Sequence, residues 1–311
     1  MAGAHTMRAL LAHGSDPATL TDETVAAPAP AAGEVLVAVH ATAITAGELA
    51  WPDVAPFIPA HDVSGVVAAV GEQVADLHTG DEVYGLIGFD RPGAAAEFVA
   101  VPEIQLATKP ATVDHAAAAT LPLGALTAWQ ALVDHAAVQK GQHVLVHGGA
   151  GGVGNFTVQL AAHLGARLTA TASATDTAFV AALGADTVID YRQRFEDQIK
   201  DVDIVIDTVG GETLTRSWDV LRPGGVLISV ADPPPTDAAE AHRARGVYFV
   251  VEPNRDQLAE LARLVDNGSL RPMIGRVFPL REAAAAFLTQ RDSHIRGKIV
   301  IEVRPKPPAG A

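Results

Sequence analysis

The chain has 311 residues, of which 49% are hydrophobic, and it contains no cysteine. Its length predicts two domains, and the missing thiols exclude disulfides, thiolate catalysis and cysteine-ligated zinc. A net charge of -14 argues against a nucleic-acid partner. Because no apolar run is long enough to cross a bilayer and the first residues do not resemble a signal peptide, we expect a cytoplasmic protein without a membrane partner.

The first third of the chain alternates short β-rich segments with Gly, Pro and Asp, which predicts a small all-β unit. Asp114 is expected to open an alanine-rich helix, and a second helix is expected from Gly124 to His135. The strands predicted in this unit are Val35–Ala41, Val63–Val70, Glu82–Leu86 and Ala96–Val101.

A glycine-rich stretch, VLVHGGAGGVG, runs from Val144 to Gly154. Its glycines match the G-x-G-x-x-G spacing, an apolar strand-like run precedes it, and a helical pattern follows it. Such a turn lets a pyrophosphate approach the backbone at the positive end of a helix dipole. The stretch therefore predicts a dinucleotide site formed by Gly149, Ala150, Gly151, Gly152, Val153 and Gly154.

Strands and helices alternate after this loop, as in a doubly wound parallel sheet. The expected strands are His143–His147, Arg167–Thr171, Thr187–Asp190, Asp203–Asp207, Val226–Val230 and Tyr248–Val251, with helices at Asp176–Leu183, Glu212–Leu221 and Arg255–Asp266. A helix over Leu280–Gln290 and a strand over Lys298–Val303 follow, and this strand is expected to return to the N-terminal β unit. The proline-rich tail from Arg304 is expected to be flexible.

Several short motifs occur in this order: Gly33–Val37, His61–Val67, Gly80–Gly85, Thr127–Ala128, Ala150–Gly154, Leu183–Asp186, Asp190–Tyr191, Arg222–Gly225 and Arg296–Lys298. With the order of elements, they resemble the medium-chain dehydrogenase/reductase superfamily, in particular its zinc-free quinone oxidoreductase branch. The likeness covers nearly the whole chain.

The resemblance implies an α/β fold, with a Rossmann doubly wound parallel sheet beside a GroES-like, β-rich catalytic domain. The GroES-like domain is expected over residues 1–123 and the nucleotide-binding domain over 124–275, with a return to the first domain and a flexible tail over 276–311. It further implies hydride transfer by a nicotinamide held in the cleft between the domains, and a homodimer.

Zinc-dependent relatives hold a catalytic metal with Cys, His and Cys. Here His61-Asp62 falls at the histidine position, whereas the cysteine positions correspond to Ala46 and the Leu123-Gly124 region. A catalytic zinc needs about three protein ligands, so no metal is expected, and His61 is interpreted as a hydrogen-bonded cleft or core histidine.

The end of the second Rossmann strand governs the choice of cofactor. NAD enzymes place an acid there, whereas this chain has Thr171 to Thr175 without a carboxylate, which predicts NADPH. Ser173 and Thr175 are expected to bind the 2′-phosphate, together with Tyr191 and its neighbour Arg192. Asp176 adds a negative charge, so use of NADH stays open, as does a role of Ser173, Thr175 and Asp176 in capping the next helix.

The resemblance places the substrate beside the segment after the first strands. Thr45 is expected to orient a carbonyl and Trp51 to stack on a planar ring. Glu48 is a candidate proton donor, and water or a relay through the ribose hydroxyl stays open as the alternative source. A role for Trp51 as a core aromatic stays open. The rest of the cofactor bed is expected from Thr127, Val209, Gly210, Ser229, Phe249, Val250 and Val251, the last three along the sixth strand, and from Lys298.

These features predict a zinc-independent, NADPH-dependent reductase of quinones or other activated carbonyl compounds, whose partner is a small-molecule electron acceptor. Three alternatives stay open. The protein could reduce the double bond of enones and enals, it could bind a dinucleotide as a sensor or structural protein without turnover, or, least in keeping with the residues, it could be a zinc alcohol dehydrogenase.

Overall fold

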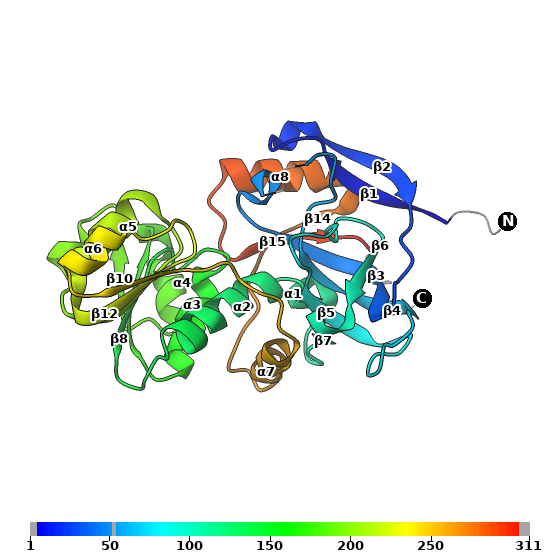
Figure 1. Cartoon of the computed structure of the whole chain (residues 1–311). Coiled ribbons are helices and arrows are strands. Elements are labelled where there is room, and N and C mark those ends of the chain that lie inside the picture. Colours follow the sequence, from blue (N-terminus) through cyan, green and yellow to red (C-terminus); the bar gives the residue numbers. More distant parts are fainter. Residues whose placement is uncertain (1–4, 52–53, 305–311) are drawn as a thin grey trace. The chain divides into compact units, whose positions relative to one another are not determined.

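The computed structural model describes residues 5–51 and 54–304, and it divides the chain into two compact units (Figure 1). The first unit holds the described residues up to Leu123, residues 252–267, and those from Pro272 onward. The second holds residues 124–251 and 268–271. No helix among the described residues is long and apolar enough to span a membrane. The tail beyond Arg304 lies outside the described residues.

A seven-stranded sheet forms the centre of the first unit, in the order β14-β15-β3-β4-β5-β7, with β6 also pairing with β3. Its strands are β3 (Glu34–Ile44), β4 (Asp62–Val70), β5 (Glu82–Leu86), β6 (Phe98–Pro102), β7 (Leu106–Thr108), β14 (Ile274–Pro279) and β15 (Lys298–Glu302). The predicted return of the last strand is confirmed, because β15 pairs antiparallel with β3 and places Ile299 opposite Ile44. Strands β1 (Thr6–Ala12) and β2 (Leu20–Ala26) form a separate antiparallel pair.

Three α-helices pack in the first unit: α1 (His115–Ala118), α7 (Arg255–Asp266) and α8 (Ala283–Asp292). Asp114 caps α1 as expected, its carboxylate accepting the Ala117 N–H. Helix α7 was expected in the nucleotide-binding domain, and the structure places it in the first unit. Tyr84 of β5 donates a hydrogen bond to the Leu258 carbonyl over 2.5 Å, and Asp266 accepts the Thr112 N–H over 2.9 Å. These hydrogen bonds join residues far apart in the sequence, so no local pattern could predict where α7 packs.

The second unit contains a six-stranded sheet in the order β10-β9-β8-β11-β12-β13, in which every neighbouring pair is parallel. Its strands are β8 (His143–Val146), β9 (Arg167–Ala172), β10 (Thr187–Asp190), β11 (Val202–Asp207), β12 (Leu221–Ser229) and β13 (Arg245–Tyr248). The helices are α2 (Pro122–Trp129, its first two residues in the first unit), α3 (Gly154–His163), α4 (Thr177–Ala182), α5 (Gly211–Ser217) and α6 (Thr236–Ala241). This order is that of a Rossmann sheet, which confirms the predicted fold class.

The sixth strand lies earlier in the chain than predicted. Arg245 pairs with Val226 and the strand ends at Tyr248, so Phe249, Val250 and Val251 follow the strand instead of lying along it. The prediction was wrong because the apolar run after Tyr248 has the stronger β propensity, whereas Arg245 and Gly246 carry little. Helix α6 and strands β1, β2, β7 and β14 were not predicted.

Candidate functional site

The glycine loop joins β8 to α3 in a turn that only glycine allows at its key positions. Gly148 has a φ of +72°, and a Cβ added to Gly154 would lie 2.0 Å from the Gly148 carbonyl oxygen. Val153, at the N-cap of α3, has no side chain that caps the helix. No side chain caps the start of α3, so the positive end of its dipole faces the glycine loop, which fits a dinucleotide pyrophosphate.

Asn155, which was not among the predicted site residues, holds this loop from the first turn of α3. Its side-chain Nδ2 donates to the carbonyl oxygens of Gly151 at 2.7 Å and Gly152 at 3.2 Å. The residue is fully buried. A polar residue directly after the last glycine of the motif was the available signal.

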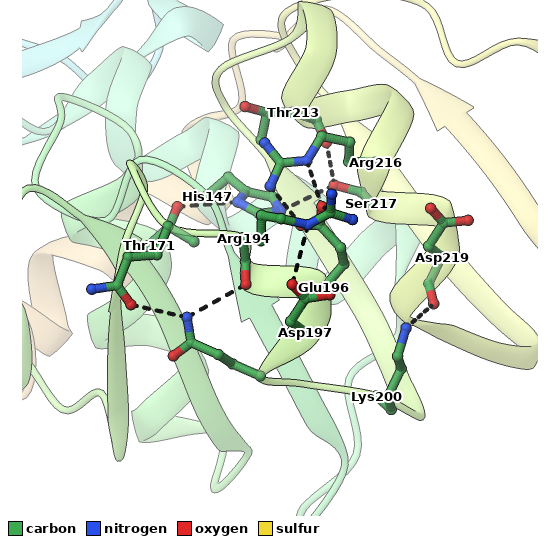
Figure 2. A network of polar contacts seen from close by, with 12 residues as sticks. His147, Thr171, Arg194, Glu196, Asp197, Lys200, Thr213, Arg216, Ser217 and Asp219 are labelled. Carbon is green, nitrogen blue, oxygen red and sulfur yellow. Dashed lines mark hydrogen bonds and ion pairs between the residues drawn. The ribbon is translucent and has the colours of Figure 1, made fainter.

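A buried histidine lies directly before the loop. Ser217 of α5 uses its hydroxyl proton to bond the Thr213 carbonyl at 2.7 Å, so Nε2 of His147, which is 3.0 Å from the Ser217 oxygen, must donate to it. Nδ1 of the neutral ring is then an acceptor, and the Thr171 hydroxyl donates a hydrogen bond to it over 3.0 Å. Figure 2 shows His147 between Thr171 and Ser217.

Burial, helped by the positive charge of Arg216, lowers the pKa of His147 to about 3. The ring is therefore neutral at physiological pH, in agreement with its hydrogen bonds. Arg216 itself forms an ion pair with Glu196, its Nε donating over 3.0 Å (Figure 2). This network was not predicted, because a histidine in an apolar strand is indistinguishable in sequence from an ordinary core residue.

The predicted 2′-phosphate residues gather at the carboxyl end of β9. The Ser173 hydroxyl lies 2.8 Å from the Thr175 hydroxyl and donates to the Asp176 carboxylate over 2.6 Å. Tyr191 donates its N–H to the Ala172 carbonyl at 3.0 Å, which places it beside this group. Neither Ser173 nor Asp176 caps a helix through its side chain, contrary to the capping alternative for these two residues.

Asp207 shapes the turn that carries Val209 and Gly210, and it too was missed by the sequence analysis. Its carboxylate accepts the N–H groups of both residues at 3.1 Å. The predicted cofactor residue Ser229 supports this turn: its hydroxyl donates to Asp207 and accepts the N–H groups of Ala231 and Asp232. Because a hydroxyl has one proton and two lone pairs, Ser229 has no hydrogen-bonding capacity left for a cofactor.

The remaining predicted residues of this unit differ in exposure. Thr127 is buried in α2, and Val251 is also buried. Val250 is exposed, and the ring of Phe249 lies 4.4 Å from the ring of His135. These four positions stay predictions as cofactor contacts.

In the first unit, the structure brings Lys298 together with the predicted substrate residue Thr45. The Lys298 ammonium donates to the Thr45 hydroxyl over 2.7 Å and lies 2.9 Å from Oδ2 of Asp62, an ion pair whose angles fall outside those of a hydrogen bond. The other Asp62 oxygen accepts the Leu123 N–H at 2.6 Å. Lys298, predicted among the cofactor residues, therefore lies with Thr45, a residue predicted to bind the substrate.

Glu48 lies in the same buried cluster, and neither of its carboxylate oxygens has a hydrogen-bond partner in the described part of the chain. Only 3% of the residue is exposed. Burial raises the pKa of Glu48 to about 8, with Asp62 adding to the rise and Lys298 opposing it. Burial also raises the pKa of Asp62, against the Lys298 charge. Glu48 is therefore neutral at pH 7. Asp62 lies in an ion pair with Lys298.

Trp51, which follows Glu48 in the chain, belongs to a group of packed aromatic rings. Trp51 is 42% exposed, which does not fit the core-aromatic alternative, and its ring meets the Phe89 ring edge-on at 5.2 Å. His61 packs against Phe89 at 5.1 Å. Phe89 was missed by the sequence analysis, because nothing local distinguishes it from a core residue.

The residues around His61 do not fit a catalytic zinc. Nδ1 of His61 lies 3.2 Å from the Ile87 carbonyl, burial lowers its pKa, and Asp62 is paired with Lys298. No group of three or more His, Cys, Asp or Glu side chains suited to a metal ion occurs within residues 5–51 and 54–304. Among these residues, the donors near His61 are fewer than a catalytic zinc needs.

Two family models match the chain: the alcohol dehydrogenase GroES-like domain over residues 31–111 and the zinc-binding dehydrogenase over residues 183–301. A probable zinc-binding oxidoreductase of mitochondria from Arthroderma benhamiae is 34% identical over 310 residues, covering 92% of this chain and 93% of that protein. The chain belongs to the medium-chain dehydrogenase/reductase superfamily, among its quinone oxidoreductase-like members. It is thus an oxidoreductase of an NAD(P)H-dependent family.

Other members of the superfamily are similar over most of the chain. An NADPH-dependent alkenal/one oxidoreductase of Arabidopsis thaliana chloroplasts is 37% identical over 259 residues, which cover 79% of this chain but 64% of that protein, less than two thirds of its length. The structure of the quinone oxidoreductase from Coxiella burnetii superposes with a TM-score of 0.91 at 32% identity, covering 96% of this chain and 100% of the other.

Proposed function

We propose that this oxidoreductase is a zinc-independent reductase that uses NADPH to reduce conjugated carbonyl compounds, quinones among them. The observation that carries the proposal is the hydrogen bond from Lys298 to Thr45, in the chain segment that also holds the half-exposed Trp51. The described residues of this unit hold no group suited to a metal ion. A charged donor behind a hydroxyl suits a carbonyl oxygen, and an aromatic surface suits a planar acceptor. The names of the Arabidopsis and Coxiella relatives agree with this chemistry.

The proposed reaction consumes NADPH, a proton and the acceptor, and yields NADP⁺ and the acceptor reduced by two electrons. When bound, the nicotinamide supplies the hydride. The glycine loop and the uncapped start of α3 hold the pyrophosphate. Ser173, Thr175 and Tyr191 would hold the 2′-phosphate once the Ser173 hydroxyl turned from Asp176 toward it. Thr45 donates a hydrogen bond to the carbonyl oxygen, on which negative charge develops as the hydride is added.

Reduction of the carbon–carbon double bond of enones and enals is the second candidate, favoured by the buried, protonated Glu48. In that reaction hydride adds to the β carbon and a proton must reach the α carbon. A neutral carboxylic acid close to Thr45 is a suitable source of that proton. Quinone reduction needs no proton at carbon.

An acceptor screen with product analysis tests both candidates. We expect NADPH to be consumed with p-benzoquinone, methyl vinyl ketone, or both. A saturated ketone from methyl vinyl ketone supports the double-bond reductase, whereas turnover with quinones alone supports the first candidate. NADPH binding without oxidation by any quinone, enone or aldehyde would instead favour a sensor or structural protein.

The assembly and the compartment are further proposals. We propose a homodimer in the cytoplasm, on the basis of the family resemblance and of the sequence features described above. The names of the Arthroderma and Arabidopsis relatives place those proteins in mitochondria and chloroplasts. Sedimentation equilibrium and microscopy of a tagged chain test the two proposals, and a monomer or an organellar signal would overturn them.

A further inference from the structure

The buried charges beside Thr45 have a defined direction of hydrogen bonding. A lysine ammonium has three N–H donors and no acceptor, so the Thr45 oxygen must accept from Lys298 in their 2.7 Å contact. The proton of the Thr45 hydroxyl therefore points away from Lys298. Thr45 is the partly exposed member of this group, whereas Lys298 and Asp62 are 3% and 0% exposed.

The sheet fixes this arrangement from three strands. Lys298 is the first residue of β15, Thr45 directly follows β3, and the pairing of Ile299 with Ile44 brings the two ends side by side. Asp62 is the first residue of β4. Its side chain is held by the Leu123 N–H, and its carbonyl oxygen accepts the Thr42 hydroxyl.

We propose that Asp62 and Lys298 are positioning residues that make Thr45 a hydrogen-bond donor to the carbonyl oxygen of the acceptor. Asp62 holds the ammonium, the ammonium occupies a lone pair of Thr45 and polarises its O–H bond, and the hydroxyl then stabilises negative charge on the acceptor's oxygen. Thr45 keeps its proton throughout; the proton that completes the reduction comes from another source.

Glu48 is consistent with this role. Two ionised carboxylates beside one ammonium would leave the buried group with a net negative charge and would compete for the protons of Lys298. With Glu48 neutral, the group has no net charge, and Lys298 remains directed at Asp62 and Thr45. The inference deepens the proposed function and rests on it.

The test compares Thr45→Val, Thr45→Ser and the double variant Lys298→Met with Asp62→Asn, which removes both charges and so leaves no lone buried ion. With methyl vinyl ketone or p-benzoquinone as acceptor, we expect kcat/KM to fall at least about tenfold in T45V and in the double variant, and T45S to recover most of it. A triple variant that combines T45V with the two charge-removing substitutions should be little slower than T45V alone, because Lys298 acts through Thr45. Thr289→Val, which removes a hydroxyl bonded to the Ala285 carbonyl, is the matched control.

A second readout does not depend on turnover. The infrared carbonyl band of labelled cyclohexanone, bound with NADP⁺, should lie at lower frequency in the wild type than in T45V, with the double variant between them. The inference would be overturned if the wild type and T45V gave the same band. It would also be overturned if the rate loss of the triple variant equalled the product of the losses in T45V and in the double variant. Turnover by the wild type would still uphold the proposed function in both cases. A wild type that reduces neither acceptor would overturn both. If the double variant unfolds, Lys298→Arg replaces it in the comparison. The guanidinium N–H donors lie at different positions from those of the ammonium, so the carbonyl band of bound cyclohexanone should move.

Discussion

The His147 imidazole and the Thr171 hydroxyl lie 3.0 Å apart at the base of the glycine loop. Thr171 in turn accepts the Gly148 N–H at 3.3 Å with its side chain and the Gly149 N–H at 2.9 Å with its carbonyl. Two successive peptides of the loop are thus fixed by one threonine, whose hydroxyl is oriented by a buried neutral histidine.

The burial of His147 makes the second unit sensitive to acid. The pKa of His147 is about 3 in the fold, against an ordinary value of 6.5. Below pH 6.5 the unfolded chain binds a proton that the folded chain does not, so stability falls with pH by about 1.4 kcal/mol per pH unit from this group, down to about pH 3. Urea unfolding from pH 7 to pH 4.5 measures the loss.

Other buried histidines also lower the free energy of unfolding in acid. The control is therefore the difference in this free energy between the wild type and His147→Gln. His147→Gln should be less stable than the wild type at pH 7, and its disadvantage should shrink as the pH falls, because it lacks the titrating ring. A disadvantage that stays constant between pH 7 and pH 4.5 would show that His147 does not remain neutral in the fold.

Gly154→Ala should weaken cofactor binding. The added Cβ would meet the backbone oxygen of Gly148 at 2.0 Å, and a backbone carbonyl cannot move aside without opening the loop. We expect NADPH affinity to fall at least about tenfold in calorimetric titrations. Gly14→Ala is the matched control, since its Cβ would have 3.8 Å to its nearest neighbour, the Thr19 hydroxyl. Wild-type affinity in G154A would contradict the assignment of the loop.

Asp176→Asn should shift cofactor preference toward NADPH. The Asp176 carboxylate, bonded to Ser173, places negative charge among the residues proposed to bind the 2′-phosphate. Removing that charge should raise the affinity for NADPH relative to NADH several-fold, with a smaller effect at high salt. Asp201→Asn, on an exposed residue with a φ of +57° that asparagine tolerates, is the control. An unchanged ratio would mean that Asp176 lies away from the phosphate.

Glu48→Gln should stabilise the protein at neutral and alkaline pH. The pKa of Glu48 is about 8 in the fold, against 4.5 ordinarily. Between these values the unfolded chain loses a proton that the folded chain keeps, so stability falls as the pH rises, by about 1.4 kcal/mol per pH unit. Glutamine has no such cost, so the Tm advantage of E48Q should grow from pH 5 to pH 8. An advantage independent of pH would contradict a protonated Glu48.

The sequence predicted the second unit well because its signals are local. Alternating apolar runs and helical patterns are set by neighbouring residues, and the glycine spacing identifies one end of the sheet. The shifted β13 shows where this fails, since strand pairing outweighs propensity at Arg245 and Gly246.

The site was predicted only in part, because its polar partners are distant in the chain. Lys298 and Thr45 are 253 residues apart, and Ser217 lies 70 residues from His147. Motif matching brought out Lys298 and Thr45 separately, but it could not show that one donates to the other. Ser229 shows the opposite case, because a position expected to bind cofactor has its hydroxyl fully engaged within the protein.

The central claim is hydride transfer from NADPH to conjugated carbonyl acceptors without a metal. The most direct measurement is the rate of NADPH oxidation by chelator-treated protein, followed by absorbance with p-benzoquinone and with methyl vinyl ketone. We predict turnover with at least one acceptor that is unchanged by chelation, and slower turnover with NADH. Tight NADPH binding without oxidation, or activity that returns only when zinc is added, would contradict it.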